Sequence, residues 1–132
     1  MKLFDTLSST YKLLPKVGTV TIYNCGPTLY NRLHLGNLRP ILTFDFLIRY
    51  LREKKISYKY VLNLTDIDEK IILKAQSEDK SISEVVGEYT YSFLSILDNL
   101  GIIYPDNFPR VSDNIDNIQL IISSLLNCRK AK

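Results

Sequence analysis

Two short runs of strand-forming residues flank a long helical pattern in the first half of the chain. Residues 19–23 are β-branched and aromatic, which favours a strand. Residues 38–55 place their apolar side chains at helical spacings, and residues 58–64 form a short apolar run typical of a strand buried on both faces. This order predicts the opening of a doubly wound α/β sheet, in which ligands bind beyond the carboxyl ends of the strands.

Three further helices are expected, over residues 67–77, 81–100 and 113–126. Thr65 and Asp66 are expected to cap the first of them, with Asp68 and Glu69 in its opening turn, where negative charge suits the helix dipole. Residues 104–110 carry two prolines and are expected to be irregular. The predicted class is therefore α/β, with helices predominating after the second strand.

Composition narrows the class of protein. The 132 residues are 45% hydrophobic and carry a net charge of +3, which excludes a disordered tail and fits a packed domain. No apolar run approaches the roughly 18 residues that span a bilayer, so neither a membrane anchor nor a secretory signal is expected. Cys25 and Cys128 lie far apart without a paired-cysteine framework, which favours a reducing compartment. We therefore expect a cytoplasmic protein with no membrane partner.

The loop between the first strand and the first helix carries the residues best suited to chemistry. Because it joins a strand to a helix, its end offers backbone N–H groups and the positive end of the helix dipole to an anion such as phosphate. His34 can donate a hydrogen bond to a phosphate oxygen, Gly36 lets a flat ring approach the backbone, and Asn37 adds a neutral donor. The glycine fingerprints of P-loop and dinucleotide-binding proteins are absent from the sequence.

Several of these residues also have a structural interpretation. His34 is the only histidine, and from its position alone it could equally well be a satisfied structural residue. Cys25 could be a small buried apolar residue rather than a metal ligand. Asp68 and Glu69 could bind a divalent metal, but an acidic first turn is ordinarily a helix-dipole feature, and we favour that interpretation. The basic cluster at residues 49–55 is more simply a solvated helix end than an RNA contact.

The loop and the segments that follow it form a recognisable series. Residues 23–40 read Y-N-C-G-P-T-L-Y-N-R-L-H-L-G-N-L-R-P and resemble the signature of cysteinyl-tRNA synthetases, in which H-L-G-N stands in for the H-I-G-H motif of class I aminoacyl-tRNA synthetases. Other stretches resemble the same family in the same order: F-D-F-L-I-R-Y-L at 44–51, Y-V-L-N-L-T-D-I-D-E-K-I-I at 60–72, L-G-I-I-Y-P-D at 100–106 and F-P-R at 108–110. The resemblance covers nearly the whole chain.

The resemblance implies an ATP site at the start of the first helix. His34, Gly36 and Asn37 occupy positions of the H-I-G-H motif and would bind ATP. His34 and Asn37 would also stabilise the charge that develops as an aminoacyl adenylate forms. The implied reaction is the ATP-dependent activation of cysteine, followed by its transfer to tRNA(Cys) in protein synthesis.

The resemblance also implies a pocket for the substrate cysteine, lined by Gly26, Thr28 and Thr65, with Cys25 as a zinc ligand. In this family zinc binds the thiolate of the substrate, and a soft sulfur ligand binds zinc far better than a serine hydroxyl does. Zinc needs about four ligands, and the sequence contains neither C-x-x-C nor H-x-x-x-H. We therefore expect the zinc site to be incomplete in this chain.

A synthetase of this family continues through a connective insertion, the second half of the nucleotide-binding fold, a K-M-S-K-S loop and an anticodon-binding region, none of which this sequence contains. We expect residues 1–78 to form the first half of the Rossmann-type catalytic domain of a class I synthetase (a H-I-G-H-motif nucleotidyl transferase), and residues 79–132 to form a helical continuation toward the connective insertion, which is truncated. Half of such a sheet exposes a strand edge.

Three interpretations of the function remain open. The chain is an N-terminal catalytic-domain fragment of a cysteine–tRNA ligase, inactive alone, with a separate chain as a source of the missing half. Alternatively it is a freestanding nucleotide-binding module that is not an enzyme. The third candidate, a related cysteine ligase that acts on an amino sugar, ranks last because residues 31–40 resemble the synthetase more closely.

Overall fold

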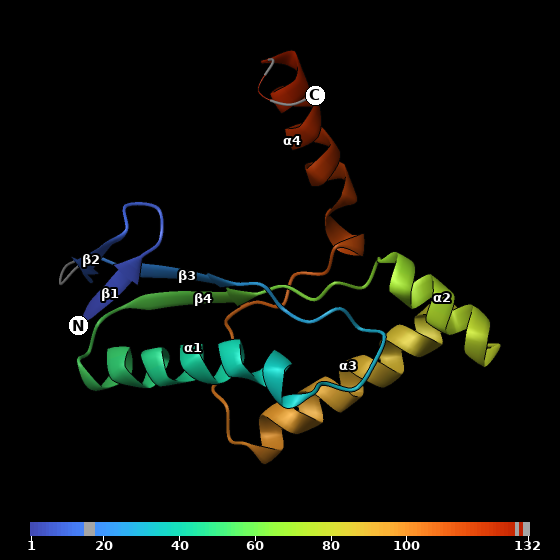
Figure 1. Ribbon diagram of the computed structural model, residues 1–132, viewed down its shortest axis with the longest axis horizontal. Coiled ribbons are helices and arrows are strands. Elements are labelled where there is room, and N and C mark those ends of the chain that lie inside the picture. The colour runs from blue at the N-terminus through green and yellow to red at the C-terminus, as the bar shows by residue number, and fades with distance from the viewer. Residues whose placement is uncertain (15–17, 129, 131–132) are drawn as a thin grey trace.

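A parallel pair of strands joined by a long helix forms the centre of the molecule (Figure 1). The computed structural model describes residues 1–14, 18–128 and 130. Strands β3 (Val20–Asn24) and β4 (Tyr58–Leu62) pair in parallel along their whole length, and helix α1 (Leu35–Glu53) connects them. The predicted strand–helix–strand order and the α/β class are confirmed.

The helices that follow β4 confirm the expected pattern, with small shifts at their ends. Helix α2 spans Glu69–Glu78 and α3 spans Ile82–Asn99, and these two helices pack against each other. A single 3-10 turn at Ser112–Asn114 leads into α4 (Ile115–Asn127). Within the described ranges, no helix has both the length and the apolar character needed to cross a bilayer.

The second edge of β4 is covered by residues 106–110, which the sequence predicts to be irregular. The backbone N–H of Leu62 donates to the carbonyl of Asn107 at 3.2 Å, and that of Leu64 donates to the carbonyl of Pro109 at 2.9 Å. Pro109 lacks an N–H, but its carbonyl remains a full acceptor. The segment is therefore irregular, as expected, yet it extends the parallel pairing and seals one edge of the small sheet.

The core lies between the two parallel strands and helices α1 and α3. Tyr60 of β4 and Phe93 of α3 are the largest fully buried side chains, and the ring of Phe44 stacks on that of Tyr60 with a centroid distance of 6.2 Å. The other buried apolar residues are Val20, Ile22, Leu29, Ile41, Leu47, Ile48, Leu51, Leu62, Leu64, Ile71, Ala75, Val85, Val86, Tyr89, Leu97 and Ile102. These side chains come from both halves of the described chain, so one core holds α3 and the strands together.

An exposed hairpin precedes the core, and no sequence pattern predicts it. Strands β1 (Lys2–Asp5) and β2 (Thr10–Leu13) pair in antiparallel fashion, with almost every residue exposed to solvent. Asp5 accepts a hydrogen bond from the backbone of Ser8 at 3.3 Å and pairs with the ammonium of Lys12. Lys12, with help from Ser8, lowers the pKa of the Asp5 carboxyl to about 2.

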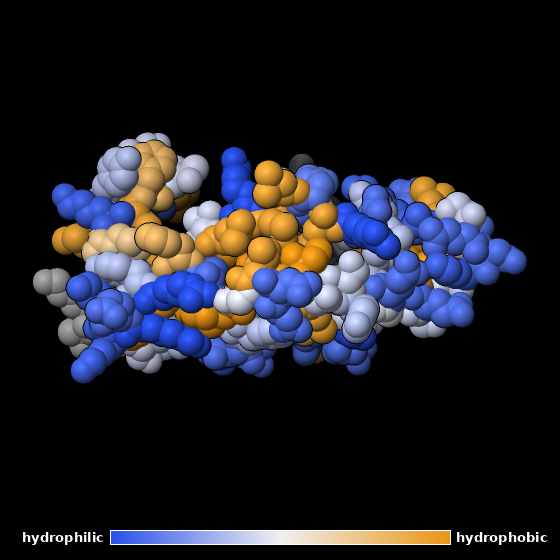
Figure 2. Space-filling view, turned by 90° about the horizontal axis from the view of Figure 1, so that it is seen from below, coloured by the Kyte–Doolittle hydropathy of each residue, from blue (hydrophilic) through white to orange (hydrophobic). Residues whose placement is uncertain are grey.

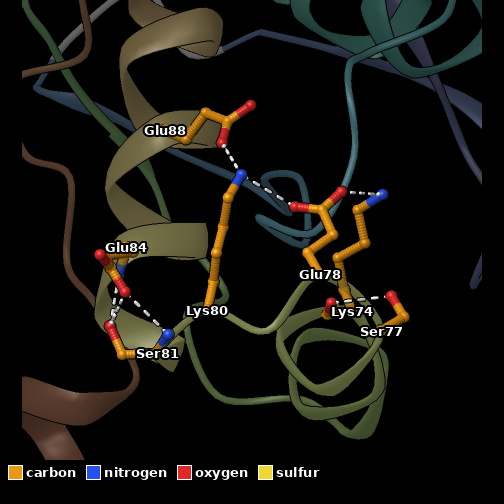
Figure 3. A network of polar contacts seen from close by, with 7 residues as sticks. All are labelled: Lys74, Ser77, Glu78, Lys80, Ser81, Glu84 and Glu88. Atoms are coloured by element: carbon orange, nitrogen blue, oxygen red, sulfur yellow. Dashed lines mark hydrogen bonds and ion pairs between the residues drawn. The ribbon is translucent and has the colours of Figure 1, made fainter.

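The turn between α2 and α3 is held by an ionic network (Figure 3). The ammonium of Lys80 lies 2.8 Å from Glu88 and 3.0 Å from Glu78, and these carboxylates raise the pKa of Lys80. Ser81 caps α3 in a reciprocal arrangement with Glu84, each accepting a hydrogen bond from the other's backbone. All of these groups lie at the surface, where ion pairs fix geometry more than they add stability.

Apolar surface remains uncovered on α4 and on the outer side of α1. Helix α4 projects away from the rest of the described chain (Figure 1). Its exposed large apolar residues are Ile115, Ile118, Leu120, Ile121, Ile122, Leu125 and Leu126. On α1, Leu35, Leu42 and Phe46 line an open groove. Figure 2 shows apolar side chains gathered over the middle of the face on the α1 side of the sheet.

Candidate functional site

His34 caps helix α1 through its imidazole ring. Its Nδ1 accepts a hydrogen bond from the backbone N–H of Gly36 at 3.1 Å. In return, the Oδ1 atom of Asn37 accepts from the backbone N–H of His34 at 3.2 Å, which completes a capping box. The helix therefore begins three residues earlier than the apolar pattern predicts, because the cap is built from the loop residues themselves.

The cap determines which nitrogen of His34 carries the proton. Since Nδ1 accepts a hydrogen bond, the proton of the neutral ring is assigned to Nε2. Nε2 has no partner among the described residues, and the side chain is exposed. Nδ1 of His34 therefore has a structural role in the cap, while Nε2–H is free to donate to a ligand. The structural and the ligand-binding interpretations of His34 are thus compatible.

Gly36 makes room for this arrangement. A Cβ at position 36 would lie 2.8 Å from Cε1 and 3.0 Å from Nδ1 of His34, closer than ordinary packing allows. The flat ring that comes close to the backbone at Gly36 is thus the imidazole of His34 itself. No acidic residue lies in the first turn of α1, so the positive end of its dipole is uncompensated there.

A pocket of about 180 Å³ opens beside His34. Its nine lining residues include three of the predicted site residues, Thr28, His34 and Asn37. They also include Arg32 and Lys70, which sequence reasoning did not select. None of the nine is acidic, so the pocket is suited to an anion. The other predicted site residues, Cys25, Gly26, Gly36 and Thr65, lie outside this lining.

Thr28 and Thr65 are brought together just beyond the carboxyl ends of β3 and β4. They form an isolated parallel bridge, in which the N–H of Leu29 donates to the carbonyl of Thr65 at 3.1 Å. The N–H of Thr65 donates to the carbonyl of Pro27 at 3.2 Å. Both threonines are half-buried, and their bridge lies beyond the carboxyl ends of the strands, where parallel sheets bind ligands.

Asn63 joins these parts, although sequence reasoning did not select it. Its side-chain oxygen accepts from the N–H of Gly26 at 2.9 Å and from the hydroxyl of Tyr23 at 3.1 Å, and its amide donates to Oγ1 of Thr65 at 3.2 Å. A Cβ at Gly26 would lie only 1.7 Å from the carbonyl oxygen of Asn63. The backbone therefore approaches closely at Gly26, and its partner there is Asn63, the residue after β4.

Cys25 is an exposed thiol whose sulfur donates only a long contact, 3.8 Å, to the carbonyl of Gly26. The alternative of a small buried apolar residue is wrong for Cys25. Across the described ranges there is no cluster of three or more histidine, cysteine, aspartate or glutamate side chains that could hold a metal ion. The residues present in the described structure therefore do not make up a zinc site by themselves.

The prediction that Thr65 and Asp66 cap helix α2 is wrong. Asp68 is the cap, and its carboxylate accepts from the N–H of Lys70 at 2.9 Å. Asp66 is instead buried and accepts from the backbone N–H of Ser112 at 3.1 Å and from its hydroxyl. Burial raises the pKa of Asp66, but the hydrogen bonds from Ser112 outweigh it and hold the pKa below its ordinary value. Asp66 thus anchors the start of the segment that leads into α4.

The chain matches the family described as tRNA synthetases class I (C) catalytic domain over residues 13–131. It is 40% identical over 131 residues to a cysteine–tRNA ligase of Mycoplasma capricolum subsp. capricolum, and 42% identical over 131 residues to one of Mesoplasma florum. Each match covers 99% of this chain and 30% of the relative. The cysteine–tRNA ligase of Rubrobacter xylanophilus is 42% identical over 126 residues, covering 96% of this chain and 27% of the relative. The chain, which spans about 30% of the length of these relatives, belongs to the class I (C) tRNA synthetase catalytic-domain family.

Proposed function

We propose that this chain carries the ATP-binding part of a cysteine–tRNA ligase. In this proposal, residues 1–78 belong to the first half of a Rossmann-type catalytic domain and residues 79–132 continue it toward a connective insertion. The complete enzyme activates cysteine with ATP and transfers it to tRNA(Cys). The observation that carries the proposal is the capping box of His34 and Asn37 beside a pocket that no acidic residue lines within the described structure.

The start of α1 supplies the groups that stabilise adenylate formation. In this step a carboxylate oxygen of cysteine bonds to the α-phosphorus of ATP, the bond from that phosphorus to the bridging oxygen breaks, and pyrophosphate leaves. Negative charge builds up on the oxygens of the α-phosphate. The Nε2–H of His34 and the amide N–H groups of Asn37 donate to these oxygens, and the positive end of the α1 dipole adds to the effect.

The assigned tautomer matters for this role. With Nδ1 held by the N–H of Gly36, His34 needs no reorganisation to present Nε2–H to a phosphate oxygen. Asn37 uses its Oδ1 atom in the cap, so its amide nitrogen is left to face a ligand. One set of hydrogen bonds thereby caps the helix and orients both donors.

The cysteine pocket lies next to this site in the proposal. Thr28 and Thr65 lie side by side with half-buried hydroxyls, and Gly26 lets the two chain segments approach closely. We also propose that Cys25 contributes one ligand to a zinc site of the complete enzyme. Because the described residues do not complete such a site, the chemistry proposed for this chain uses no step through zinc.

The test is cysteine-dependent exchange between ATP and pyrophosphate. We expect no exchange from this chain alone, and exchange from a chimera in which it replaces the matching segment of the Mesoplasma florum enzyme. In the chimera, His34→Ala is expected to slow adenylate formation and to leave cysteine binding largely intact. Robust exchange by the chain alone would overturn the proposed dependence on the rest of the enzyme.

The chimera also separates the remaining candidates. An equal loss of cysteine binding in His34→Ala would contradict the role assigned to that residue. If the chain binds ATP but no chimera activates cysteine, a nucleotide-binding module without catalysis is the better description. If the chimera forms the adenylate but transfers cysteine only to an amino sugar, the related ligase is supported instead.

A further inference from the structure

Lys70 lies in the pocket beside His34 and has no part in the roles described so far. It sits in the first turn of α2, and its ammonium nitrogen lies 5.5 Å from the centre of the Tyr30 ring. Tyr30 and His34 line the same pocket from the loop before α1. Two segments far apart in the sequence therefore contribute to a single anion-binding pocket.

The stability of α2 does not explain a lysine at this position. A cation in the first turn opposes the helix dipole. Within the described ranges Lys70 also forms no ion pair, whereas Lys74 pairs with Glu78 at 2.6 Å and Lys80 pairs with Glu88 at 2.8 Å. Lys70 is thus the lysine of this region whose charge is directed to the pocket rather than to a neighbouring carboxylate.

The contact with Tyr30 positions Lys70 without using up its hydrogen-bonding capacity. A cation over an aromatic face is attracted by the ring quadrupole, but the ring is a poor acceptor for its N–H groups. The backbone N–H of Lys70 is bound to the carboxylate of Asp68, while the ammonium keeps three donors. These donors remain available to an anion that enters the pocket.

The distribution of donors around the pocket fits a chain of phosphates better than a single phosphate. His34 and Asn37 gather at the start of α1, where one phosphate is served by the cap and the dipole. Lys70 approaches from α2, and Arg32 adds a further cation to the lining. These cations come from outside α1, and a triphosphate carries more oxygens and more negative charge than one phosphate with which to engage them.

We propose that Lys70 binds the β- and γ-phosphates of ATP and thereby makes the site prefer ATP to AMP. The proposal rests on the proposed function, because it places the α-phosphate at His34. Lys70 acts here as a specificity-determining residue that holds the leaving pyrophosphate group, and the bond-breaking step itself stays with the groups at α1.

The test compares the affinities of ATP and AMP for the full 132-residue chain by isothermal titration calorimetry. Lys70→Met is expected to weaken ATP binding about tenfold and to change AMP binding by less than about twofold, because the lost charge-assisted bonds serve only the outer phosphates. Lys70→Arg keeps the charge and is expected to retain ATP affinity within about threefold. Lys59→Met is the matched control, since it removes one lysine from an exposed position of β4 outside the pocket.

Each other outcome overturns the inference in a distinguishable way. An unchanged ATP affinity in Lys70→Met, or an equal loss for ATP and AMP, removes the assigned role while leaving the proposed function in place. An equal loss of ATP affinity in Lys59→Met would show that the net charge of the chain, and not the position of Lys70, sets the affinity. If Lys70→Met weakens the binding of an RNA hairpin ending in CCA but not that of ATP, the ammonium of Lys70 contacts a tRNA phosphate instead. If the unmodified chain binds neither nucleotide, the proposed function fails and the inference fails with it.

Discussion

Replacing Gly36 by alanine should weaken ATP binding while leaving the helix that begins there almost equally stable. The new Cβ would lie 2.8 Å from Cε1 of His34 and 3.0 Å from Nδ1, so the imidazole has to turn away. The hydrogen bond from the N–H of residue 36 to Nδ1 is then lost, and with it the constraint that places the proton on Nε2. The imidazole can still donate and accept hydrogen bonds, but the cap no longer holds it in place beside the pocket.

Two effects on the stability of α1 oppose each other in this variant. Loss of the cap hydrogen bond costs about 1 kcal/mol, while alanine stabilises a helix by up to about 1 kcal/mol relative to glycine. We therefore expect the free energy of unfolding to change by less than about 1 kcal/mol. The affinity for ATP should fall about tenfold or more, because the displaced Nε2 no longer donates to a phosphate.

Nitrogen NMR of the imidazole ring checks the structural step directly, because His34 is the only histidine in the chain. The unmodified chain should show an unprotonated Nδ1 and a protonated Nε2, and Gly36→Ala should show a mixture of tautomers. Urea denaturation measures the free energy of unfolding, and calorimetry measures ATP affinity. Gly87→Ala in α3 is the matched control, since a Cβ there meets no atom within 4 Å. If Gly36→Ala keeps both the tautomer and the ATP affinity, the coupling of cap and site is refuted.

Three further substitutions test other contacts of the site. Gly26→Ala is expected to lower the free energy of unfolding by about 3 kcal/mol or more in urea denaturation, because its Cβ would lie 1.7 Å from the carbonyl oxygen of Asn63; a loss below about 1 kcal/mol would contradict this packing. Asp66→Ala is expected to cost about 2 kcal/mol, since it leaves the donors of Ser112 unpaired. Although burial raises the pKa of Asp66, Ser112 holds that pKa below its ordinary value. The stability that the ionised carboxylate contributes is therefore fully present above about pH 4 and is lost as the pH falls through the folded-state pKa. The free energy of unfolding should depend less on pH in Asp66→Ala than in the unmodified chain. Cys25→Ser is expected to change the free energy of unfolding by less than about 0.5 kcal/mol and to leave ATP affinity unchanged, because the thiol is exposed; weaker ATP binding would reveal a contact that the structure lacks.

The elements that local signals specify could be predicted, and those made by distant pairing could not. Helix α1 and strand β3 follow from apolar spacing and β-branched residues close together in the chain. Residues 106–110 give only the local signal of two prolines, which indicates an irregular segment. Their pairing depends on Leu62 and Leu64 of a distant part of the chain, which no local pattern reveals. The exposed hairpin at the N-terminus likewise has no buried face to give it a pattern.

The error at the cap of α2 has a specific physical cause. The sequence places Thr65 and Asp66 at the cap and Asp68 in the opening turn, because threonine and aspartate both suit a cap and the apolar pattern starts at residue 67. In the fold, Thr65 is used by its bridge to Thr28 and Asp66 by its bonds to Ser112. Asp68 is left to cap the helix, and its carboxylate accepts from the backbone N–H of Lys70, whose side chain lines the pocket.

Within the candidate site, the residues of one loop could be predicted, while those that converge on it from elsewhere could not. His34 and Asn37 stand in a motif at a strand–helix junction, where the chemistry can be read from position. Lys70 stands in an acidic helix start that has an ordinary structural explanation. Only the packing of α2 against the loop turns it into a lining residue. The domain boundary near residue 78 stays a prediction, since α3 and residues 106–110 share a core with the strands.

The distribution of buried and exposed surface explains why ATP binding and catalysis should separate in this chain. The pocket beside His34 is built from the loop before α1, the first turn of α1 and the start of α2, and the neighbours of these segments include the fully packed Leu29 and Ile71. The uncovered apolar surface lies elsewhere, on the outer side of α1 and along α4, where Phe46 is 72% exposed and Leu120 is 70% exposed. Surface of this kind usually marks an interface. Because the chain spans about 30% of the length of its relatives, we expect the remaining parts of the proposed complete enzyme to cover those faces, whereas the pocket proposed for phosphate is lined by residues of this chain. A chain of this kind should therefore bind ATP measurably and turn over none of it.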